Sequence, residues 1–283
     1  MSAHAPHTAP SAPSAIPEYE VFAVRYAEVT KKRAENFLNH QPSDPHDGPM
    51  PMDYFVWLIR GAGRTILVDT GFNQASATAR NRHLLSCPIK ALAPLGVGAD
   101  EIADVIITHL HYDHAGNVNL LPNARIHIQE KELAYATGRY MAYPMLRHAF
   151  AVDDVIEIVK GLYRERLQFY DGDATMAPGI ELVWVGGHTA GLQAVRVHTA
   201  RGWVVLASDA THYYENIHRQ EPFPIVLHVG QMLEGYGKLL KLADTPDHLV
   251  PGHDPLVRSR YPQFGTHDIV CLHQAPLTPL PRF

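Results

Sequence analysis

The chain has 283 residues, of which 46% are hydrophobic and 19% charged, a globular composition with enough apolar material for a large core. Its formal net charge is −5 and its most basic stretch is only Lys31, Lys32 and Arg33, which argues against a nucleic-acid partner, because nucleic-acid binders carry clustered basic surfaces. No apolar run approaches the roughly 20 residues that span a bilayer, so no membrane partner is expected.

The N-terminal stretch is rich in Ala, Pro and Ser and lacks the basic start and apolar run of a signal peptide. We therefore expect a flexible tail over residues 1–17 and a single domain over residues 18–283. The two cysteines, Cys87 and Cys271, lie far apart and in no CxxC pair, which favours a reduced, cytoplasmic setting over a disulfide framework. The sequence leaves a monomer and a homodimer open.

In chain order, alternating apolar and polar residues predict a strand over 19–26, and the Pro-, Asp- and Gly-rich stretch 38–52 predicts an irregular loop. A hairpin is expected from strands 53–60 and 64–68, joined at residues 61–63. Further strands are expected over residues 104–108, 125–129, 180–185, 193–198, 203–208 and 248–250. Helices are expected from an N-cap at Asp100, over 130–136, over about 229–242, and with loops within 137–166. Strands in both halves with helices between them predict an α/β domain of two sheets sandwiched by helices.

The segment 108–116 carries most of the chemical information. It reads Thr-His-Leu-His-Tyr-Asp-His-Ala-Gly and follows a predicted buried strand. Three imidazoles and a carboxylate this close together stay unsatisfied unless they bind a cation, and divalent metals, zinc above all, prefer these ligands. In an extended loop His109 and His111 point the same way, whereas Asp113 and His114 follow a turn and can face a second ion.

Three more candidate ligands follow apolar strands elsewhere in the chain. His188 lies in Gly-Gly-His-Thr-Ala-Gly after the predicted strand 180–185, and Asp209 directly follows the strand 203–208. His253 lies in Pro-Gly-His-Asp after the last short strand. Each stands where a rigid strand gives way to a loop of small residues, which is where functional groups gather.

Taken together, HxHxDH, GH, SDA and GH resemble the metallo-β-lactamase superfamily in order and spacing, as does the early turn Ile-Leu-Val-Asp-Thr-Gly at residues 66–71. The resemblance covers roughly residues 50–260. It implies the αβ/βα sandwich of that superfamily, two mixed β-sheets flanked by helices, with the metals at one edge of the sheets.

The resemblance also implies which side chains bind the metals and which side chain supports the ligand loops. It implies two divalent metal ions, with Zn2+ as the usual occupant, held by His109, His111 and His188, by Asp113, His114 and His253, and by a bridging Asp209. Asp69 would buttress the ligand loops through hydrogen bonds. Manganese, cobalt and iron stay open, because metal supply decides occupancy as much as ligand type does.

Within the superfamily the chain is similar to N-acyl homoserine lactonases, which quench bacterial quorum signals. That likeness implies a lactone substrate, ring opening by a metal-bridging hydroxide, and a catalytic Asp113 that carries a proton to the leaving group. Many such lactonases place Tyr three residues after the bridging Asp, to hold the substrate carbonyl. Here His212 stands at that position, with Tyr213 next to it, and an imidazole can donate a similar hydrogen bond.

Several alternatives remain. A pyridoxolactonase-like enzyme, another ester hydrolase and a glyoxalase II-like thioesterase would use similar ligands. The iron-containing reductases on this scaffold usually have Glu where His111 stands, which argues against that class. The sequence contains no GxSxG motif, which argues against covalent catalysis by a serine. Between the ligand motifs, some large side chains either pack the domain or line a pocket for an apolar acyl chain; they are Tyr140, Met141, Tyr143, Met145 and Phe150.

Overall fold

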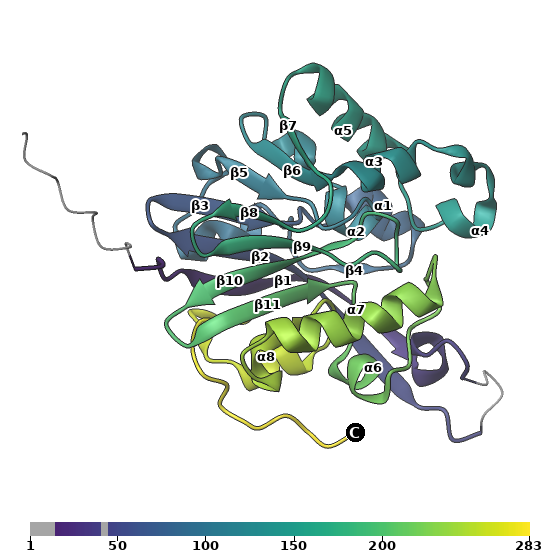
Figure 1. Ribbon diagram of the computed structural model, residues 1–283. Helices are drawn as coiled ribbons and strands as arrows, with labels where there is room; N and C mark the ends of the chain where they lie inside the picture. Colours follow the sequence, from purple (N-terminus) through teal and green to yellow (C-terminus); the bar gives the residue numbers. More distant parts are fainter. Residues whose placement is uncertain (1–14, 41–44) are drawn as a thin grey trace, which may run out of the picture.

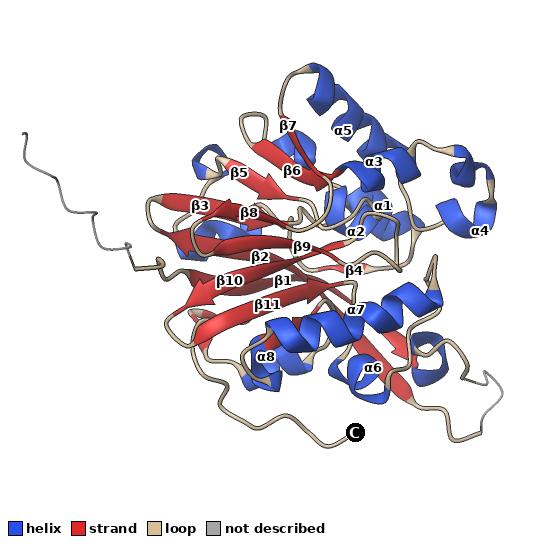
Figure 2. Ribbon diagram, in the orientation of Figure 1, coloured by secondary structure: helices blue, strands red, loops and turns tan. Residues whose placement is uncertain are grey.

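The computed structural model describes residues 15–40 and 45–283, and within them two β-sheets lie between two layers of helices (Figures 1 and 2). The first sheet has the order β13 (Gln263–Phe264), β14 (Thr266–Cys271), β1 (Glu20–Lys32), β2 (Pro49–Gly61), β3 (Arg64–Val68), β5 (Asp104–Ile106), β6 (Arg125–Gln129) and β7 (Leu167–Tyr170), with β4 (His83–Leu84) paired to β1. The second has the order β12 (Leu249–Pro251), β11 (Gly202–Ser208), β10 (Gln193–Thr199), β9 (Ile180–Trp184) and β8 (Ala174–Ala177).

Helices cover the outer faces of both sheets. The α-helices are α1 (Gln74–Ala79), α2 (Tyr112–Ala115), α3 (Glu130–Ala136), α4 (Pro144–Arg147), α5 (Val152–Tyr163), α6 (Tyr214–Arg219), α7 (Val229–Leu242) and α8 (Leu256–Arg260). Short 3₁₀ helices span Arg33–Asn36, Lys90–Leu95, Ala99–Glu101, Val118–Leu120, Arg139–Ala142 and Pro246–His248. In Figure 1, α3 and α5 lie on one side of the sheets and α7 on the other.

Three apolar layers hold these elements together. Between the sheets, Trp57 of β2 packs in one cluster with Val197 of β10 and Leu206 of β11. The first sheet buries its other face against helices that include α3 and α5. On the far side, Met232 and Tyr236 of α7 face the second sheet at helical spacing. Burying one such side chain contributes about 1.5–3 kcal/mol, so the layers themselves stabilise the predicted αβ/βα sandwich.

Some expected boundaries were wrong. β1 continues to Lys32 and β2 begins at Pro49, so the end of the expected loop 38–52 is a strand. The two strands pair continuously at this end, with Lys32 opposite Pro49, and cross-strand hydrogen bonds extend both beyond their apolar pattern. Asp100 does not cap a helix, because the 3₁₀ turn there starts from Gly98.

Other expectations agree with the structure or lie beyond it. β6, α3 and α7 have the expected bounds, whereas no sequence pattern predicted β13 and β14. Most of the expected tail, residues 1–14, lies outside the described residues. Both cysteines are free thiols. In the described part of the chain, every helix is too short or too polar to cross a membrane.

Candidate metal centre

All seven predicted ligands meet in one buried cluster, although they come from loops far apart in the sequence. The loop after β5, the turn of α2 and the loops after β9, β11 and β12 supply the side chains, which are His109, His111, Asp113, His114, His188, Asp209 and His253. Asp113 is the most exposed of them, at 8%. The strands that carry these loops end at a common edge of the sandwich, so the fold itself brings them together.

The cluster divides into two triads. The ligand atoms of His109, His111 and His188 lie within 4.8 Å of one another, and so do those of a second set formed by Asp113, His114 and His253. These are the two sets that the family resemblance implies.

Asp209 lies between the triads. Its Oδ2 is 3.4 Å from His188 Nε2, and its Oδ1 is 2.9 Å from His253 Nε2. One carboxylate oxygen thus faces each triad, which is the arrangement that a ligand shared by two ions requires.

Hydrogen bonds on the outer nitrogen fix three of these imidazoles. His188 Nδ1 donates to the carbonyl of Ile225 at 2.6 Å, and His253 Nδ1 donates to the carbonyl of Asp53 at 2.9 Å. His114 Nδ1 lies 2.7 Å from Asp69 Oδ2. A proton held on Nδ1 leaves the Nε2 lone pair facing inward, as in protein metal sites generally.

The unpartnered polar atoms of the cluster and the spacing of its nitrogen atoms both fit a bound metal ion. His114 Nε2 and Asp209 Oδ1 are buried without a hydrogen-bond partner within the described residues. His109 Nε2 and His188 Nε2 are 3.2 Å apart. Tetrahedral zinc with bonds of about 2.0–2.1 Å separates its nitrogen ligands by about 3.3 Å. The pair therefore has the spacing of two ligands on one ion.

Burial also sets the protonation of the cluster. Burial lowers the pKa of His109 and His111 well below the ordinary value, and the neighbouring imidazoles lower it further. Neutral imidazole is the form that binds metals. The pKa of His114 is raised well above its ordinary value, because the attraction of Asp209 and Asp69 outweighs burial.

Asp69 joins the loop after β3 to two ligand loops. Its Oδ1 accepts the backbone N–H of Thr108 at 2.7 Å, and its Oδ2 accepts the Thr108 hydroxyl at 2.8 Å as well as the His114 imidazole. Asp69 has a positive φ of 61°, a conformation uncommon outside glycine, and it is fully buried. Asp69 therefore forms hydrogen bonds to the ligand loops, as the resemblance implies.

Glu132 of α3 is a support that the sequence did not reveal. One carboxylate oxygen accepts the Leu110 N–H at 2.9 Å, and the other accepts the Thr189 hydroxyl at 2.6 Å and the Gly191 N–H at 2.9 Å. This fully buried side chain therefore ties the His109–His111 loop to the His188 loop. A Glu in the first turn of a helix is ordinary, so nothing in the pattern marked it.

His212 lies directly against the cluster. Its Nε2 is 2.9 Å from Asp209 Oδ2, and its ring stacks on Phe223 with centroids 3.3 Å apart and planes 7° apart. Its buried Nδ1 has no partner among the described residues. Tyr213 points elsewhere, its hydroxyl donating to the carbonyl of Pro51 at 3.1 Å. Of the two neighbours, His212 is the one at the metal centre.

Two small adjoining cavities open onto the centre. One, of about 70 Å³, is partly lined by basic side chains and includes Lys31, Arg80, Arg82, Asp113, Asp209 and His212. The other, of about 50 Å³, is mostly apolar and includes Tyr135, Met145, Leu146, Ile225, Val226 and Leu227. Both cavities share His111 and His188, so a bound molecule could extend from the metal centre in two directions.

The large side chains of residues 135–150 divide between packing and the site. Met145 lines the apolar cavity and Phe150 packs on the His111 ring, with centroids 4.6 Å apart. Met141 packs against the core, whereas Tyr140 and Tyr143 are exposed. Some of these side chains therefore pack the domain, and others lie at the cavity beside the ligand cluster, so each of the two predictions holds for part of the segment.

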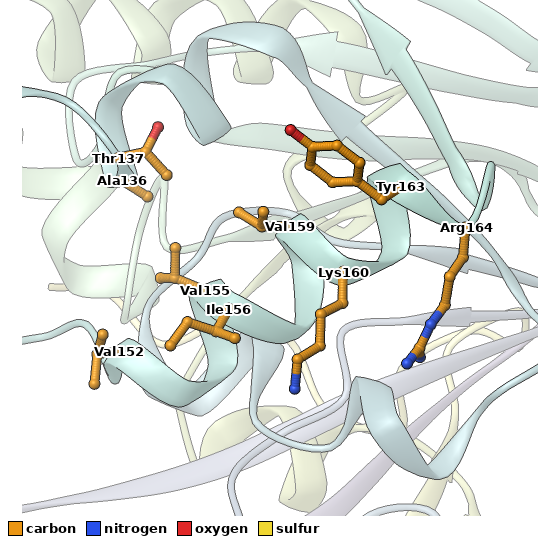
Figure 3. Close-up of a pocket in the computed structure, with 9 residues that line it drawn as sticks. All are labelled: Ala136, Thr137, Val152, Val155, Ile156, Val159, Lys160, Tyr163 and Arg164. Carbon is orange, nitrogen blue, oxygen red and sulfur yellow. The ribbon is translucent and has the colours of Figure 1, made fainter.

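A larger hollow of about 520 Å³ is lined by residues of α5 and by Ala136 and Thr137 at the end of α3 (Figure 3). Its lining is largely apolar, with Lys160 and Arg164 among its members, and it includes no His, Cys, Asp or Glu. It shares no lining residue with the cavities at the ligand cluster. It therefore offers none of the side chains that bind metals most often and lies apart from the ligand cluster.

The layered fold and the clustered His and Asp side chains define an αβ/βα protein with a candidate metal-binding site. The profile of the metallo-beta-lactamase superfamily matches residues 50–253, and the chain belongs to that superfamily.

Similar proteins carry related names. An N-acyl homoserine lactonase of Bacillus thuringiensis is 29% identical over 138 residues, which cover 48% of this chain and 49% of the relative. The chain thus spans about half the length of this relative. A probable metallo-hydrolase of Mycobacterium tuberculosis is 24% identical over 254 residues, covering 80% of this chain and 76% of the relative.

Solved structures show the same fold. A quorum-quenching N-acyl homoserine lactone lactonase superposes with a TM-score of 0.70 at 21% identity, covering 84% of this chain and 92% of the other. A probable metal-dependent hydrolase from Staphylococcus aureus gives a TM-score of 0.68 at 16% identity, covering 94% and 98%. The predicted αβ/βα sandwich is confirmed.

Proposed function

We propose that this protein is a metal-dependent hydrolase that opens lactone rings, with N-acyl homoserine lactones as the first substrate class to test. The observation that carries the proposal is the pair of buried triads joined by Asp209. The names of the Bacillus relatives supply the substrate class, and the apolar cavity beside the centre is a place for an acyl chain.

The proposed cofactor is a pair of divalent ions, with Zn2+ favoured by a set of five imidazoles and two carboxylates. When bound, such ions supply Lewis acidity, activating water near neutral pH and polarising a carbonyl oxygen. The protein contributes ligand groups that are already oriented: Nδ1 contacts aim His188 and His253 inward, and Glu132 holds two ligand loops together.

Two further side chains have proposed roles in the reaction. Asp113 lines the cavity and is the most exposed ligand, so it can carry a proton to the oxygen of the opening ring. His212 holds Asp209 by a hydrogen bond and thereby orients the shared carboxylate. Its expected donation to the substrate carbonyl requires Nε2 to leave Asp209 or Nδ1 to turn toward the substrate, and this role remains a prediction.

Proton release by the zinc-loaded protein tests the proposal. The substrates are N-hexanoyl homoserine lactone, a linear hexanoate ester and a glutathione thioester, with chelator-treated protein and Asp209→Ala as controls. Zinc-dependent opening of the lactone supports the assignment. Turnover of only the thioester would favour a glyoxalase II-like enzyme, and equal rates with and without metal would overturn the metal mechanism.

A further inference from the structure

The cavity on the Lys31 side of the metal centre is unusually basic. Lys31 lies near the end of β1, and Arg80 and Arg82 follow α1, so elements distant in sequence place three cations on one wall. The only acidic residues in the same lining are Asp113 and Asp209.

In the part of the chain that the structure describes, none of the three cations forms an ion pair. Within the described residues the Lys31 ammonium has no hydrogen-bond partner, although the side chain is half-buried. Arg82 donates to two neutral oxygens, the Tyr112 hydroxyl at 3.1 Å and the Arg80 carbonyl at 2.8 Å. Arg80 donates to the carbonyls of His148 and Phe150. Their positive charges therefore remain uncompensated by any direct carboxylate contact.

Metal binding would make this imbalance larger. Asp113 and Asp209 are the carboxylates that divalent ions would neutralise. The acidic groups that still act on the wall are then Glu35, on Lys31, and Asp154, on Arg80, and within the described residues neither forms an ion pair with these cations. Cations gathered at a partly buried wall repel one another and the metals, so the arrangement is stabilised when an anion enters. The adjoining cavity, which has Leu146 and Val226 in its lining, suits an apolar group.

We propose that the substrate is amphiphilic, with an apolar group in the Leu146 cavity and a carboxylate bound by Lys31 and Arg82 on the other side of the scissile carbonyl. The proposal rests on the proposed hydrolase function and narrows its substrate class, because a neutral acyl homoserine lactone leaves the basic wall unmatched. Arg80 holds the backbone of the wall through its carbonyl contacts and adds to its positive potential.

A matched pair of esters tests the proposal on the zinc-loaded protein. 4-Carboxyphenyl hexanoate and 4-carbamoylphenyl hexanoate have nearly the same shape and differ in charge. Lys31→Gln should lower kcat/KM for the carboxylate ester about tenfold to a hundredfold, mainly through KM, and leave the carboxamide ester within about twofold. Lys32→Gln is the control, since Lys32 is the next residue of β1, is exposed, and changes the net charge equally. Comparing each variant with the wild type cancels the intrinsic reactivities of the two esters.

The outcomes separate this proposal from the hydrolase proposal. An equal change for both esters in Lys31→Gln, or no change for either, overturns the carboxylate site while hydrolysis itself stands. If neither ester is hydrolysed, the hydrolase proposal is in question, and calorimetric binding of 4-(hexanoylamino)benzoate and its benzamide counterpart replaces turnover. A preference for the benzoate that Lys31→Gln loses and Lys32→Gln keeps supports the site; equal affinities overturn it.

Discussion

His109 and His188 are 79 residues apart in the chain, yet their Nε2 atoms lie 3.2 Å from each other at the centre of the cluster. His188 holds its Nδ1 proton on the carbonyl of Ile225, so its Nε2 presents a lone pair. The burial-lowered pKa of His109 favours the neutral ring there too. Two lone pairs at this distance repel each other, and a cation between them turns the repulsion into attraction.

Zinc should therefore stabilise the folded protein. Ligand present at about 100 times its dissociation constant adds about 2.7 kcal/mol to the free energy of unfolding. For a chain of this size that is a rise in Tm of about 5 °C. Thermal melts of chelated and zinc-titrated protein, together with metal analysis, measure the effect.

His188→Ala should remove most of that zinc-dependent rise, because it breaks one triad. His83→Ala is the matched control, since His83 is an exposed imidazole away from the cluster. Identical melting curves for the chelated and zinc-loaded wild type would contradict metal binding at this site.

Because Glu132 links two ligand loops by hydrogen bonds, we expect it to affect both stability and zinc affinity although it is not itself a ligand. Glu132→Gln keeps the shape but turns an amide N–H₂ toward groups that are themselves donors, and each buried group left unsatisfied costs about 1–3 kcal/mol. We expect the free energy of unfolding to fall by about that amount and zinc affinity to fall about tenfold to a hundredfold. Urea denaturation and zinc competition titrations measure the two quantities.

Glu130→Gln in the same helix is the control, because Glu130 is exposed. If Glu132→Gln binds zinc as tightly as the wild type, the carboxylate does not position the loops.

His212 should act through Asp209. His212→Phe removes the hydrogen bond to the Asp209 carboxylate, so zinc affinity should fall about tenfold or more. His212→Gln keeps a donor near that position and should recover part of the loss. Zinc competition titrations separate this positioning role from a role in substrate binding alone. A role in substrate binding alone would leave the zinc affinities of both variants unchanged and alter only KM.

The cluster of candidate ligands could be predicted from the sequence because metal chemistry constrains both residue type and position. His109, His111, Asp113 and His114 lie within six residues, and the remaining ligands follow recognisable strands. α3 and α7 were predictable for a similar reason, since their apolar spacing is regular.

The supporting residues could not be predicted, because their contacts depend on tertiary structure. Glu132 reaches Thr189 across 57 residues, and Lys31 joins Arg82 only because β1 extends past its apolar pattern. No local pattern carries such contacts. The sequence therefore yields the candidate ligands but not the charged side chains that surround them.

The apolar cavity predicts a dependence on acyl-chain length. Each methylene group transferred from water into the cavity contributes about 0.8 kcal/mol, or about fourfold in kcat/KM, until the cavity is filled. Leu146→Asn should flatten this dependence without changing the rate on the shortest chain. A series of acyl homoserine lactones measures it; the same slope in wild type and variant would show that the chain binds elsewhere.

Asp154 predicts a pH dependence of stability away from the metal centre. Burial, reinforced by Asp153, raises its pKa to about 6 against an ordinary 3.8, and its Oδ2 has no partner among the described residues. Because the folded-state pKa is the higher one, the protonated form stabilises the fold at low pH. That contribution is lost as pH rises from about 4 through about 6.

Asp154→Asn stays uncharged throughout, so it should match the wild type near pH 4 and exceed its free energy of unfolding by about 1–3 kcal/mol near pH 8. Urea denaturation of the chelated proteins across this range measures the difference, and the exposed Glu234→Gln is the control. A constant difference at every pH would mean that the substitution acts through packing, because only the ionisation of a buried carboxylate makes the gain grow with pH.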